Sequence, residues 1–517
     1  MNINKFPQIS TNINKYLLIS LIFFLGILLL FSQNFSISQS TTKAQSSYVS
    51  IGKGCTNAYY IDKDCDGYGG ASPLGPDADD NDPEVNTPQT VIAKYGNLTN
   101  FLHHLGYYPD RIFYIATNGN DNTGEVNNIN KPYKTWNAVK PQLQPGDAVI
   151  FRGGTYIREE NIPKFGFPDK LSGKENVPII FMVYPGEKVV IDGKINFPES
   201  SWLIFDGFIL DNFVDRWGTG IRGPLSHNII IRNIESRNHG SGCHLMYDLH
   251  NILIENCVFH DNPNSHGIYL GSSDIPSTNI IVRNCLMYKN GRHGFQQNGK
   301  ATNFLVENNI IHSNKLGGLS LLNGITNSIF RNNLIFNNSR PGIIFYNYTG
   351  GYYPNASNDN NLFINNLIWI GKYENVMGGT QEYKSAVLFN DDTGSFTFTN
   401  NTFRNNIFVT YSGETFYFQQ HKHFPSTIIE NNIFYKMGNN PNIVMTSDKG
   451  DYDFETFESM SSLVKNNLLA DPKLTDISID YYSTPEKFNF DYLSDSPARN
   501  HGTTTDAPST DLRGNPR

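Results

Sequence analysis

The segment Asn279–Asn290, "NIIVRNCLMYKN", returns with few changes at Asn303–Asn314, "NFLVENNIIHSN". Three more copies lie nearby, and the central asparagines of the five copies are spaced by 23, 28, 24 and 24 residues: Asn233, Asn256, Asn284, Asn308 and Asn332. An internal period of this length is typical of a solenoid. Each coil then holds three short strands, and each strand pairs with its equivalent in the next coil. Weaker copies follow at residues 363–370, 427–437 and 462–472.

Stacking of equivalent coils places like residues in columns. Asn262, Asn290, Asn314 and Asn338 end successive strands of the repeat. Their amides can therefore form hydrogen-bonded ladders along the stack and satisfy backbone groups at the turns. We interpret the asparagine excess of this chain as structural.

The flanks of the repeats carry a family resemblance. Three stretches resemble proteins of the pectate-lyase-like superfamily. They are the strand-like start at Ile112, the segment "PGDAVIFRGGTY" that ends at Tyr156, and the tail "SPARNHGTTTDAPSTDLRGNPR". This resemblance implies an all-β fold, a right-handed single-stranded parallel β-helix, with both ends of the solenoid capped. The amphipathic segment 134–140 is the expected N-terminal cap. The expected organisation is a signal peptide or membrane anchor (1–45), an acidic module (50–90), a cap and first rungs (110–200), the repeats (201–475) and a closing segment (476–517).

Composition narrows the class of protein. The chain has 517 residues, a formal net charge of -8, 17% charged and 13% aromatic residues. This length suffices for a large core. The absence of a long Lys/Arg run argues against nucleic acid as the partner, because phosphate binding needs a clustered basic surface.

One apolar run, from Tyr16 to Ser32, follows Lys5 and Lys15 and precedes a Ser/Thr/Gln-rich stretch. This pattern is that of an export signal or an uncleaved anchor, and the run is at the short end of what a spanning helix needs. The rest of the chain is therefore expected outside the cytoplasm: extracellular, periplasmic or on the cell surface. Any membrane contact is expected only through this anchor.

The acidic module begins near Tyr59 and contains Asp62, Asp64 and Asp66 at alternate positions, followed by Gly67. This spacing repeats the opening of a calcium loop, in which oxygens of every second residue converge. The module resembles the metal-binding motif of secreted bacterial proteins, akin to thrombospondin type 3 repeats, which implies structural calcium. A solvated acidic linker is the alternative. The predicted ligands are Asp62, Asp64, Asp66, Asp77, Asp79 and Asp82, with Asp80 in the same second cluster.

The five cysteines divide into two kinds. Cys55 and Cys65 lie close together in the acidic module, where an oxidising compartment could pair them. The other three fall inside apolar strand-like runs and are expected as small buried hydrophobic residues: Cys243, Cys257 and Cys285.

Another strand follows each copy of the asparagine-rich repeat. Its side chains alternate between the two faces of the sheet, which predicts an inward and an outward row of residues. The inward row is Cys243, Ile268, Phe295, Leu319 and Ile343; the outward row is His244, Tyr269, Gln296, Ser320 and Ile344. With the preceding corner residues, the outward row predicts an exposed polar strip along which an extended acidic polysaccharide or cell-surface glycan could bind. The candidate catalytic residues are His266, Tyr269, Lys289, Arg292 and His293, and the candidate substrate-binding residues are His244, Gln296 and Tyr346.

The chemistry expected of this strip is proton abstraction beside a uronate carboxylate. Arg292 or Lys289 would neutralise the carboxylate, while His266, His293 or Tyr269 would move protons. Tyr346 and the insertion tyrosines Tyr348, Tyr352 and Tyr353 would stack on sugars. A second column, with His260, His312, Arg237 and Tyr288, is interpreted as surface.

The stretch Asn290–Asn309, "NGRHGFQQNGKATNFLVENN", is similar to the Arg-His-Gly-Phe region of mannuronan C5-epimerases, which implies roles for Arg292 and His293. The chain departs from that family one rung earlier, where Ser241, His244 and Met246 stand at the positions of the family's tyrosine, aspartate and histidine. Two hypotheses therefore stay open: a polysaccharide lyase or uronate epimerase, and a non-catalytic, calcium-stabilised surface scaffold or adhesin. The fold serves both.

Overall fold

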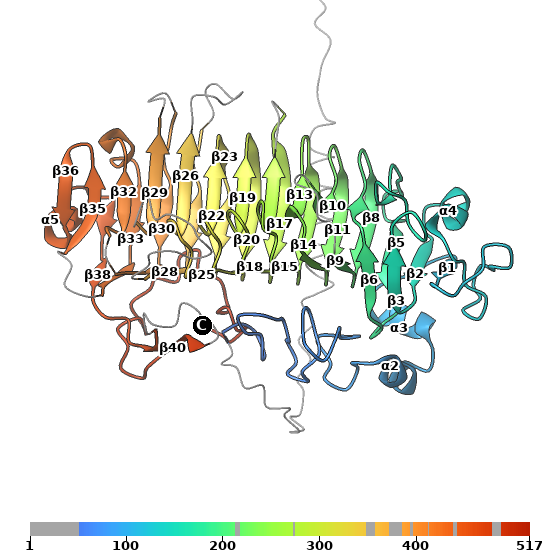
Figure 1. Cartoon of the computed structure of the whole chain (residues 1–517). Coiled ribbons are helices and arrows are strands. Elements are labelled where there is room, and N and C mark those ends of the chain that lie inside the picture. Colours follow the sequence, from blue (N-terminus) through green and yellow to red (C-terminus); the bar gives the residue numbers. More distant parts are fainter. Residues whose placement is uncertain are drawn as a thin grey trace, which may run out of the picture. The chain divides into compact units, whose positions relative to one another are not determined.

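The computed structural model describes residues 51–211, 218–271, 275–347, 357–371, 385–392, 396–411, 413–437, 442–477 and 487–517. Successive coils stack side by side in chain order, and each contributes one strand to each of three parallel sheets (Figure 1). The prediction of a right-handed parallel β-helix is confirmed. In the described residues no helix is long and apolar enough to cross a membrane. The predicted signal or anchor at 1–45 lies outside these residues, as do Tyr348, Tyr352 and Tyr353.

Sheet 1 consists largely of the strands that precede the central asparagine of each repeat. In the described part of the chain its strands are β1 (Ile112–Ile115), β2 (Ala148–Phe151), β5 (Ile179–Val183), β8 (Ser201–Asp206), β11 (His227–Arg232), β14 (His250–Glu255), β17 (Ser277–Arg283), β20 (Ala301–Glu307), β23 (Ile325–Thr326), β24 (Ile329–Arg331), β27 (Leu362–Ile364), β30 (Thr402–Arg404), β33 (Ile428–Glu430) and β37 (Val464–Lys465). Sheet 2 comes next in each coil. Its strands are β3 (Gly154–Ile157), β6 (Val189–Asp192), β9 (Ile209–Asp211), β12 (Glu235–Arg237), β15 (Val258–His260), β18 (Leu286–Tyr288), β21 (Ile310–His312), β25 (Leu334–Phe336), β28 (Leu367–Ile370), β31 (Ile407–Thr410), β34 (Ile433–Lys436) and β38 (Leu468–Leu469).

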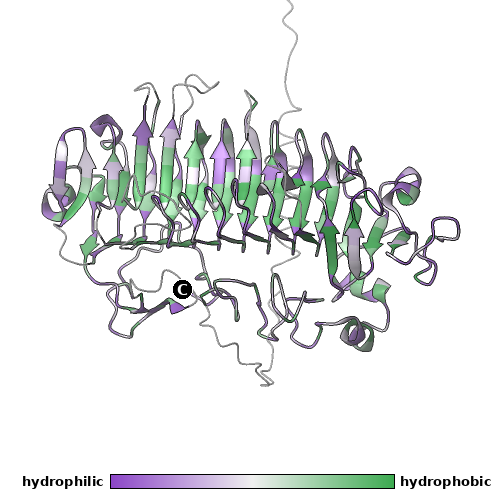
Figure 2. Ribbon diagram, in the orientation of Figure 1, coloured by the Kyte–Doolittle hydropathy of each residue, from purple (hydrophilic) through white to green (hydrophobic). Residues whose placement is uncertain are grey.

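Sheet 3 completes each coil and carries the predicted polar strip. Its described strands are β4 (Phe167–Pro168), β7 (Ile195–Asn196), β10 (Thr219–Arg222), β13 (Ser241–Leu245), β16 (Ile268–Gly271), β19 (Phe295–Asn298), β22 (Leu319–Leu322), β26 (Ile343–Asn347), β29 (Val387–Asp391), β32 (Phe416–Phe418), β35 (Ile443–Ser447) and β36 (Gly450–Asp453). The inward row predicted for this sheet is confirmed, since every member is fully buried: Cys243, Ile268, Phe295, Leu319 and Ile343. Apolar residues, in green, make up much of the strands, and polar segments, in purple, interrupt them (Figure 2).

The asparagine ladder is confirmed at atomic detail. The Nδ2 of Asn290 donates to Oδ1 of Asn314 at 2.9 Å, and Asn314 donates to Asn338 at 3.0 Å. The same Asn314 amide donates to the carbonyl of Met287. A second ladder, which was not predicted, runs through Asn309, Asn333, Asn366, Asn406, Asn432 and Asn467. The central asparagines of the phrase have positive φ, as at Asn284 with 54°, a conformation that asparagine tolerates better than most residues.

Helices cover the two ends of the stack. At the N-terminal end, α4 (Trp136–Val139) and the 3₁₀ turn η1 (Lys140–Gln142) occupy the segment predicted as the cap. The fully buried ring of Trp136 contacts the rings of Phe167 and Phe181 at 5.8 and 5.6 Å. At the other end β36 turns back antiparallel to β35, and α5 (Phe454–Ser459) buries Phe457. The exposed strand edges are thereby blocked. A further 3₁₀ turn, η3 (His421–His423), follows β32.

The acidic module and the C-terminal segment both lie against the outer face of sheet 2. Ile51, Ala58 and Ile61 pack with Val258, Leu286, Ile310 and other sheet 2 residues in one apolar cluster. From the other terminus Leu474, Phe488 and Phe490 join the same cluster, near the hairpin of β39 (Leu474–Asp476) and β40 (Asn489–Tyr492). The helices α2 (Pro88–Tyr95) and α3 (Leu98–His104) instead contribute to a cluster on sheet 1.

This cover corrects one prediction. The column of Arg237, His260, Tyr288 and His312 exists, but it is not a surface column. Tyr288 and His312 are 5% and 0% exposed. The Nε2 of His312 lies 2.7 Å from the carbonyl of Ala58, and the hydroxyl of Tyr288 donates to the carbonyl of Tyr59 at 3.3 Å. The acidic module, more than two hundred residues away in the sequence, buries these side chains.

The cysteines behave as their positions suggested. A disulfide joins Cys55 to Cys65 in the acidic module. The other three are free and buried: Cys243, Cys257 and Cys285. The module residues that bind His312 and Tyr288, namely Ala58 and Tyr59, lie in the loop that this disulfide closes.

Candidate functional site

The outward side of sheet 3 carries a groove of about 600 Å³, here called the polar groove. Its floor is the predicted outward row, because His244 pairs with Tyr269, Tyr269 with Gln296, Gln296 with Ser320 and Ser320 with Ile344. Further residues along its edges are Ser241, His266, Arg292, His293, Asn298, Leu316, Leu322, Arg340, Pro341, Tyr346, Leu388 and Asn390.

Glycine at or just before the start of β13, β16, β19, β22 and β26 brings the corner residues together. A Cβ on Gly267 would lie 2.7 Å from the carbonyl of Gly294, and one on Gly294 would lie 2.3 Å from Cγ2 of Ile311. A larger residue would therefore push the rungs apart. The preceding residues, His266 and His293, stack as a consequence, with ring centroids 5.5 Å apart and an angle of 7°.

The backbone determines the tautomer of these two histidines. The N–H of His293 donates to Nδ1 of His266 at 3.3 Å, and the N–H of Gly317 donates to Nδ1 of His293 at 3.0 Å. Each ring is neutral, with its proton on Nε2. Burial, aided by Arg340 and Arg292, lowers the pKa of His293 to about 3, and burial with the nearby His293 lowers the pKa of His266 well below its usual value. Both rings are therefore hydrogen-bond donors toward a ligand.

Tyr269 lies at the centre of this group. Its ring is half-buried and contacts the rings of His244 at 4.5 Å and His266 at 5.3 Å. The hydroxyl accepts a hydrogen bond from Nδ2 of Asn298 at 2.9 Å. Burial and Arg222 lower the pKa of His244 to about 4, so this ring is neutral too. The Nε2 of His244 is buried and has no hydrogen-bond partner among the described residues.

The lowered pKa values give a testable pH dependence. We expect the imidazole NMR signals of His266 and His293 to show no titration between pH 5 and 8. In the unfolded chain these rings titrate near pH 6.5, so below that pH the unfolded state binds more protons than the folded state. The contribution of these two rings to the unfolding free energy should therefore fall as the pH drops from about 6.5 toward 3. A midpoint near 6.5 for either ring in the folded protein would contradict the lowered pKa values.

The structure brings most of the predicted strip together, with one exception. His244, His266, Tyr269, Arg292, His293, Gln296 and Tyr346 all line the polar groove. Arg292 is exposed, and the hydroxyl of Tyr346 donates to Oδ2 of Asp392 at 2.7 Å. Lys289 lies elsewhere: its Nζ is 5.3 Å from the ring centroid of Tyr59 in the acidic module. Lys289 follows directly on β18 of sheet 2, so it faces the segment that covers that sheet.

Arg340 also lines the groove, although it was not among the predicted site residues. It lies in one column with Arg292, since the N–H of Leu316 donates to the carbonyl of Arg292 and the N–H of Arg340 donates to the carbonyl of Leu316. A signal was present in the sequence. Arg292 and Arg340 each stand two residues before the glycine that precedes a sheet 3 strand, in "RHG" and "RPG".

The groove residues allow some reactions and not others. In the described part of the chain, no Asp or Glu lines the groove. Hydrolysis by a pair of carboxylates therefore has no support there, because it needs two such groups flanking the scissile bond. The groove instead offers guanidinium groups, neutral imidazole donors and a tyrosine hydroxyl. This combination suits a carboxylate ligand and proton transfer next to it.

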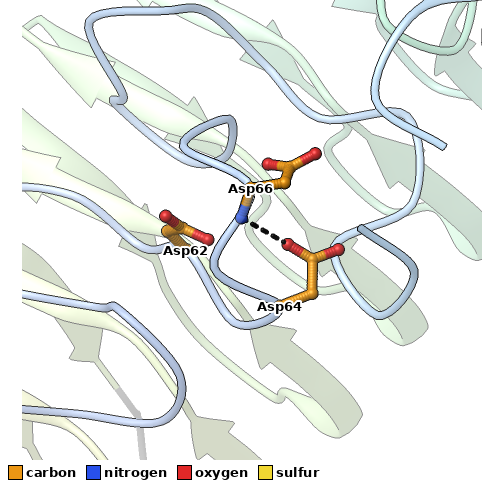
Figure 3. A group of neighbouring side chains, drawn as sticks. All are labelled: Asp62, Asp64 and Asp66. Atoms are coloured by element: carbon orange, nitrogen blue, oxygen red, sulfur yellow. Dashed lines mark hydrogen bonds between the residues drawn. The ribbon is translucent and has the colours of Figure 1, made fainter. Parts of the chain in front are cut away.

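The acidic module forms a second candidate site, here called the acidic cluster. Carboxylate oxygens of Asp62, Asp64 and Asp66 lie within 4.8 Å of one another, and so do those of Asp64, Asp77 and Asp80. Figure 3 shows the first three side chains around one bend of the chain, where the N–H of Asp66 donates to Asp64 at 3.3 Å. Burial and neighbouring carboxylates raise the pKa of Asp64 to about 8 and of Asp77 to about 9. Burial likewise raises the pKa of Asp62 to about 6.

Two of the predicted ligands do not reach this cluster. Asp79 lies 3.1 Å from Nε2 of His104, and Asp82 contacts Lys94, so both bind α2 and α3 instead. Asp80 takes their place, 3.4 Å from the Nζ of Lys63. Of the second acidic run, Asp77 and Asp80 therefore belong to the acidic cluster, while Asp79 and Asp82 bind the helices.

The acidic cluster fits a calcium ion. All of its donors are carboxylate oxygens, the ligand type that calcium prefers. The Oδ2 atoms of Asp64 and Asp77 are buried without a hydrogen-bond partner in the described residues. Buried carboxylates are costly unless they are paired or bind a metal.

Comparison with known proteins locates the chain by fold. Residues 195–368 and 263–457 match the model of a family described as the right handed beta helix region, and together these matches span 195–457. No curated protein sequence matches the chain.

Several solved structures are similar. Pectate lyase Pel9A is 17% identical over 80% of this chain and 98% of its own, with a TM-score of 0.46. The A-module of the mannuronan C-5 epimerase AlgE4 of Azotobacter vinelandii is 16% identical over 63% and 86%, at 0.39. PfbA, a surface adhesin of Streptococcus pneumoniae, is 11% identical over 61% and 88%, also at 0.39. At these identities the likeness concerns the chain trace alone.

Proposed function

The chain belongs to the right-handed β-helix family, and from that premise we propose that its polar groove binds an acidic polysaccharide and acts on it as a lyase or uronate C5-epimerase. The observation that carries this proposal is the constellation around Tyr269. The half-buried phenol of Tyr269 is flanked by the neutral imidazoles of His244 and His266. Arg292 lies on the next rung of the same groove. These groups are complementary to a sugar carboxylate and to the proton next to it.

Each group has a distinct task in the proposed reaction. The exposed Arg292 pairs with the uronate carboxylate and stabilises the negative charge that moves onto it when the neighbouring carbon loses its proton. The Nε2–H groups of His266 and His293 donate to carboxylate or hydroxyl oxygens. Tyr269 reacts as the phenolate: it takes the proton from the carbon next to the carboxylate and, as the phenol, gives it to the glycosidic oxygen when that bond breaks. The histidines cannot take this proton, because their Nδ1 atoms are occupied and their Nε2 atoms are already protonated. Asn298 orients the Tyr269 hydroxyl.

The acidic cluster has a structural role in this proposal. A calcium ion held by Asp62, Asp64, Asp66, Asp77 and Asp80 would neutralise the module that covers sheet 2. The cluster and the polar groove belong to different sheets, so the ion takes no part in the reaction. We further propose an extracellular or surface location, in keeping with the disulfide between Cys55 and Cys65.

The test is turnover of uronate polysaccharides. The protein is incubated with alginate, polygalacturonate and glycosaminoglycans, and unsaturated ends are followed by absorbance and uronate stereochemistry by NMR. Arg292→Gln and Tyr269→Phe should each lower kcat/KM by about 10²- to 10⁴-fold. Lys449→Gln, a change of an exposed lysine outside the groove, is the matched control and should keep full activity. Undiminished turnover by both groove variants would place the reaction elsewhere.

A second candidate function is a non-catalytic scaffold or adhesin stabilised by calcium. One observation favours it: both histidines use Nδ1 to bind the backbone of the next rung, which is a stabilising task in itself. In that case the groove binds a glycan without changing it. Saturable binding that Arg292→Gln weakens, with no product from any polymer, would select this function over catalysis.

A further inference from the structure

The cations of the polar groove are spaced two rungs apart. In the described residues Arg292 and Arg340 are the arginines that line the groove, no lysine does so, and Leu316 stands between them in the same column. Backbone hydrogen bonds of 3.0 and 3.2 Å connect the three residues from rung to rung. Neighbouring parallel strands are about 4.8 Å apart, so the backbones of the two arginines are about 10 Å apart along the groove.

The opposite edge of the groove carries no cation. Its described members are Asn298, Leu322, Tyr346 and Asn390, which continue one column of sheet 3. The Oδ1 of Asn390 is buried without a hydrogen-bond partner among the described residues, so this edge offers an acceptor to a ligand hydroxyl or amide group. Neutral polar groups therefore face the cationic column.

This pattern selects among acidic glycans. An extended glycan lying along the sheet advances by roughly one sugar per rung, since a 1,4-linked pyranose is about as long as the strand spacing of about 4.8 Å. Carboxylates on sugars i and i+2 then reach Arg292 and Arg340. A carboxylate on the intervening sugar meets Leu316 on one edge or Leu322 and Asn298 on the other. It loses water without gaining a cation, which is unfavourable.

We propose that the ligand is a glycan with a disaccharide repeat, in which a uronate alternates with a neutral sugar, and that Arg292 and Arg340 bind the carboxylates of consecutive repeats. This inference rests on the proposed function of the groove and specifies its substrate class. Arg340 is thereby a specificity residue. A neutral sugar occupies the rung of Leu316, where its apolar face packs against the leucine side chain.

The test compares oligosaccharides of equal length by calorimetry. A hexasaccharide of alternating glucuronate and N-acetylglucosamine should bind about tenfold more tightly than hexagalacturonate or hexamannuronate. Arg340→Gln should remove this preference, while Leu316→Arg, which adds a cation on the middle rung, should reverse it in favour of the homouronates. Lys449→Gln is the control and should leave both affinities unchanged. An unchanged melting temperature shows that each variant is folded.

The outcomes separate the two proposals. Equal or tighter binding of the homouronates by the unmodified protein overturns the alternating repeat, yet loss of that binding in Arg292→Gln keeps the groove as the glycan site. An alternating preference that survives both Arg340→Gln and Leu316→Arg also overturns it. If none of the hexasaccharides binds, the proposed function fails together with this inference.

Discussion

Replacing Asp206 with alanine is expected to lower the free energy of unfolding by about 3–5 kcal/mol, because it leaves a buried guanidinium without its counter-ion. The Nε of Arg232 lies 2.8 Å from Oδ2 of Asp206, and the two side chains are only 12% and 8% exposed. Asp206 also accepts from Nδ2 of Asn233 at 2.7 Å and from the Tyr107 hydroxyl at 3.3 Å. All of these interactions are lost together in the variant.

The interaction belongs to a longer row at the end of the sheet 1 strands. Asp206, Arg232, Glu255, Arg283, Glu307 and Arg331 are in register on successive strands and alternate in sign. Arg283 and Arg331 bind Glu255 and Glu307, both at 2.7 Å. Arg232 differs from these because α3 and the segment after it cover it: its guanidinium lies 4.8 Å from the ring centroid of Tyr107.

The denaturation midpoint in urea measures this effect. Glu199→Ala is the matched control, since Glu199 and its partner Lys170 are more than half exposed and such a pair contributes about 0–1 kcal/mol. Asp206→Asn should be intermediate, because the amide keeps hydrogen bonds but removes the charge. A midpoint for Asp206→Ala equal to that of Glu199→Ala would show that Arg232 finds water or another partner.

Removal of calcium is expected to produce the second large change. An ion that binds only the folded state stabilises it by about 2.7 kcal/mol when its concentration is a hundred times the dissociation constant. Chelation should therefore lower the melting temperature and expose the sheet 2 face that Ile51, Ala58 and Ile61 cover. Faster hydrogen exchange at the backbone of β18, β21 and β25 would report this exposure.

The pH dependence follows from the raised pKa values in the acidic cluster. The folded-state pKa is about 8 for Asp64 and about 9 for Asp77, whereas the unfolded chain releases these protons near pH 4. Between about pH 4 and 9 these two aspartates thus bind more protons in the metal-free folded protein than in the unfolded chain, and their contribution to stability falls as the pH rises. Calcium competes with protons for the carboxylates, so the stabilisation by calcium should grow over the same range.

One variant pair identifies the ligands. Asp77→Asn should stabilise the metal-free protein at pH 8 and abolish the response to calcium. At that pH the folded protein must keep the Asp77 carboxyl protonated although the unfolded chain ionises it, and the amide removes this cost. Asp82→Asn should keep that response, since Asp82 contacts Lys94 on α2. A calcium response that Asp82→Asn removes and Asp77→Asn preserves would mean that the ion binds outside the acidic cluster.

Most of the fold could be predicted because its information is local and repeated. The period of about 24 residues, the inward row through Phe295 and the ladder through Asn314 each depend on residues that recur at one spacing. A one-residue shift of any rung would turn its apolar row outward. The second ladder, through Asn333, also depends on residues that recur at this spacing. Its sequence signal is the second asparagine of "ENN" and "RNN".

The site could be predicted only where it lies on one sheet. His244, Tyr269 and Gln296 share a face because alternation within β13, β16 and β19 requires it. Lys289 could not be excluded from the groove by spacing alone, as it lies in a turn whose direction depends on the whole coil. The choice of Asp80 over Asp79 and Asp82 depends on where α2 and α3 place Lys94 and His104.

The sequence by itself determined the solenoid, its three strands per rung and the polar row that faces outward, since stacking of near-identical coils leaves one arrangement that buries every apolar column. Only the tertiary structure decided which outer faces stay open. The acidic module and the C-terminal segment both fold back onto sheet 2 and bury Tyr288 and His312, while the described chain leaves a groove on sheet 3. The physical reason is that such covering depends on contacts between segments that are far apart in the sequence, for which no periodic pattern provides a register.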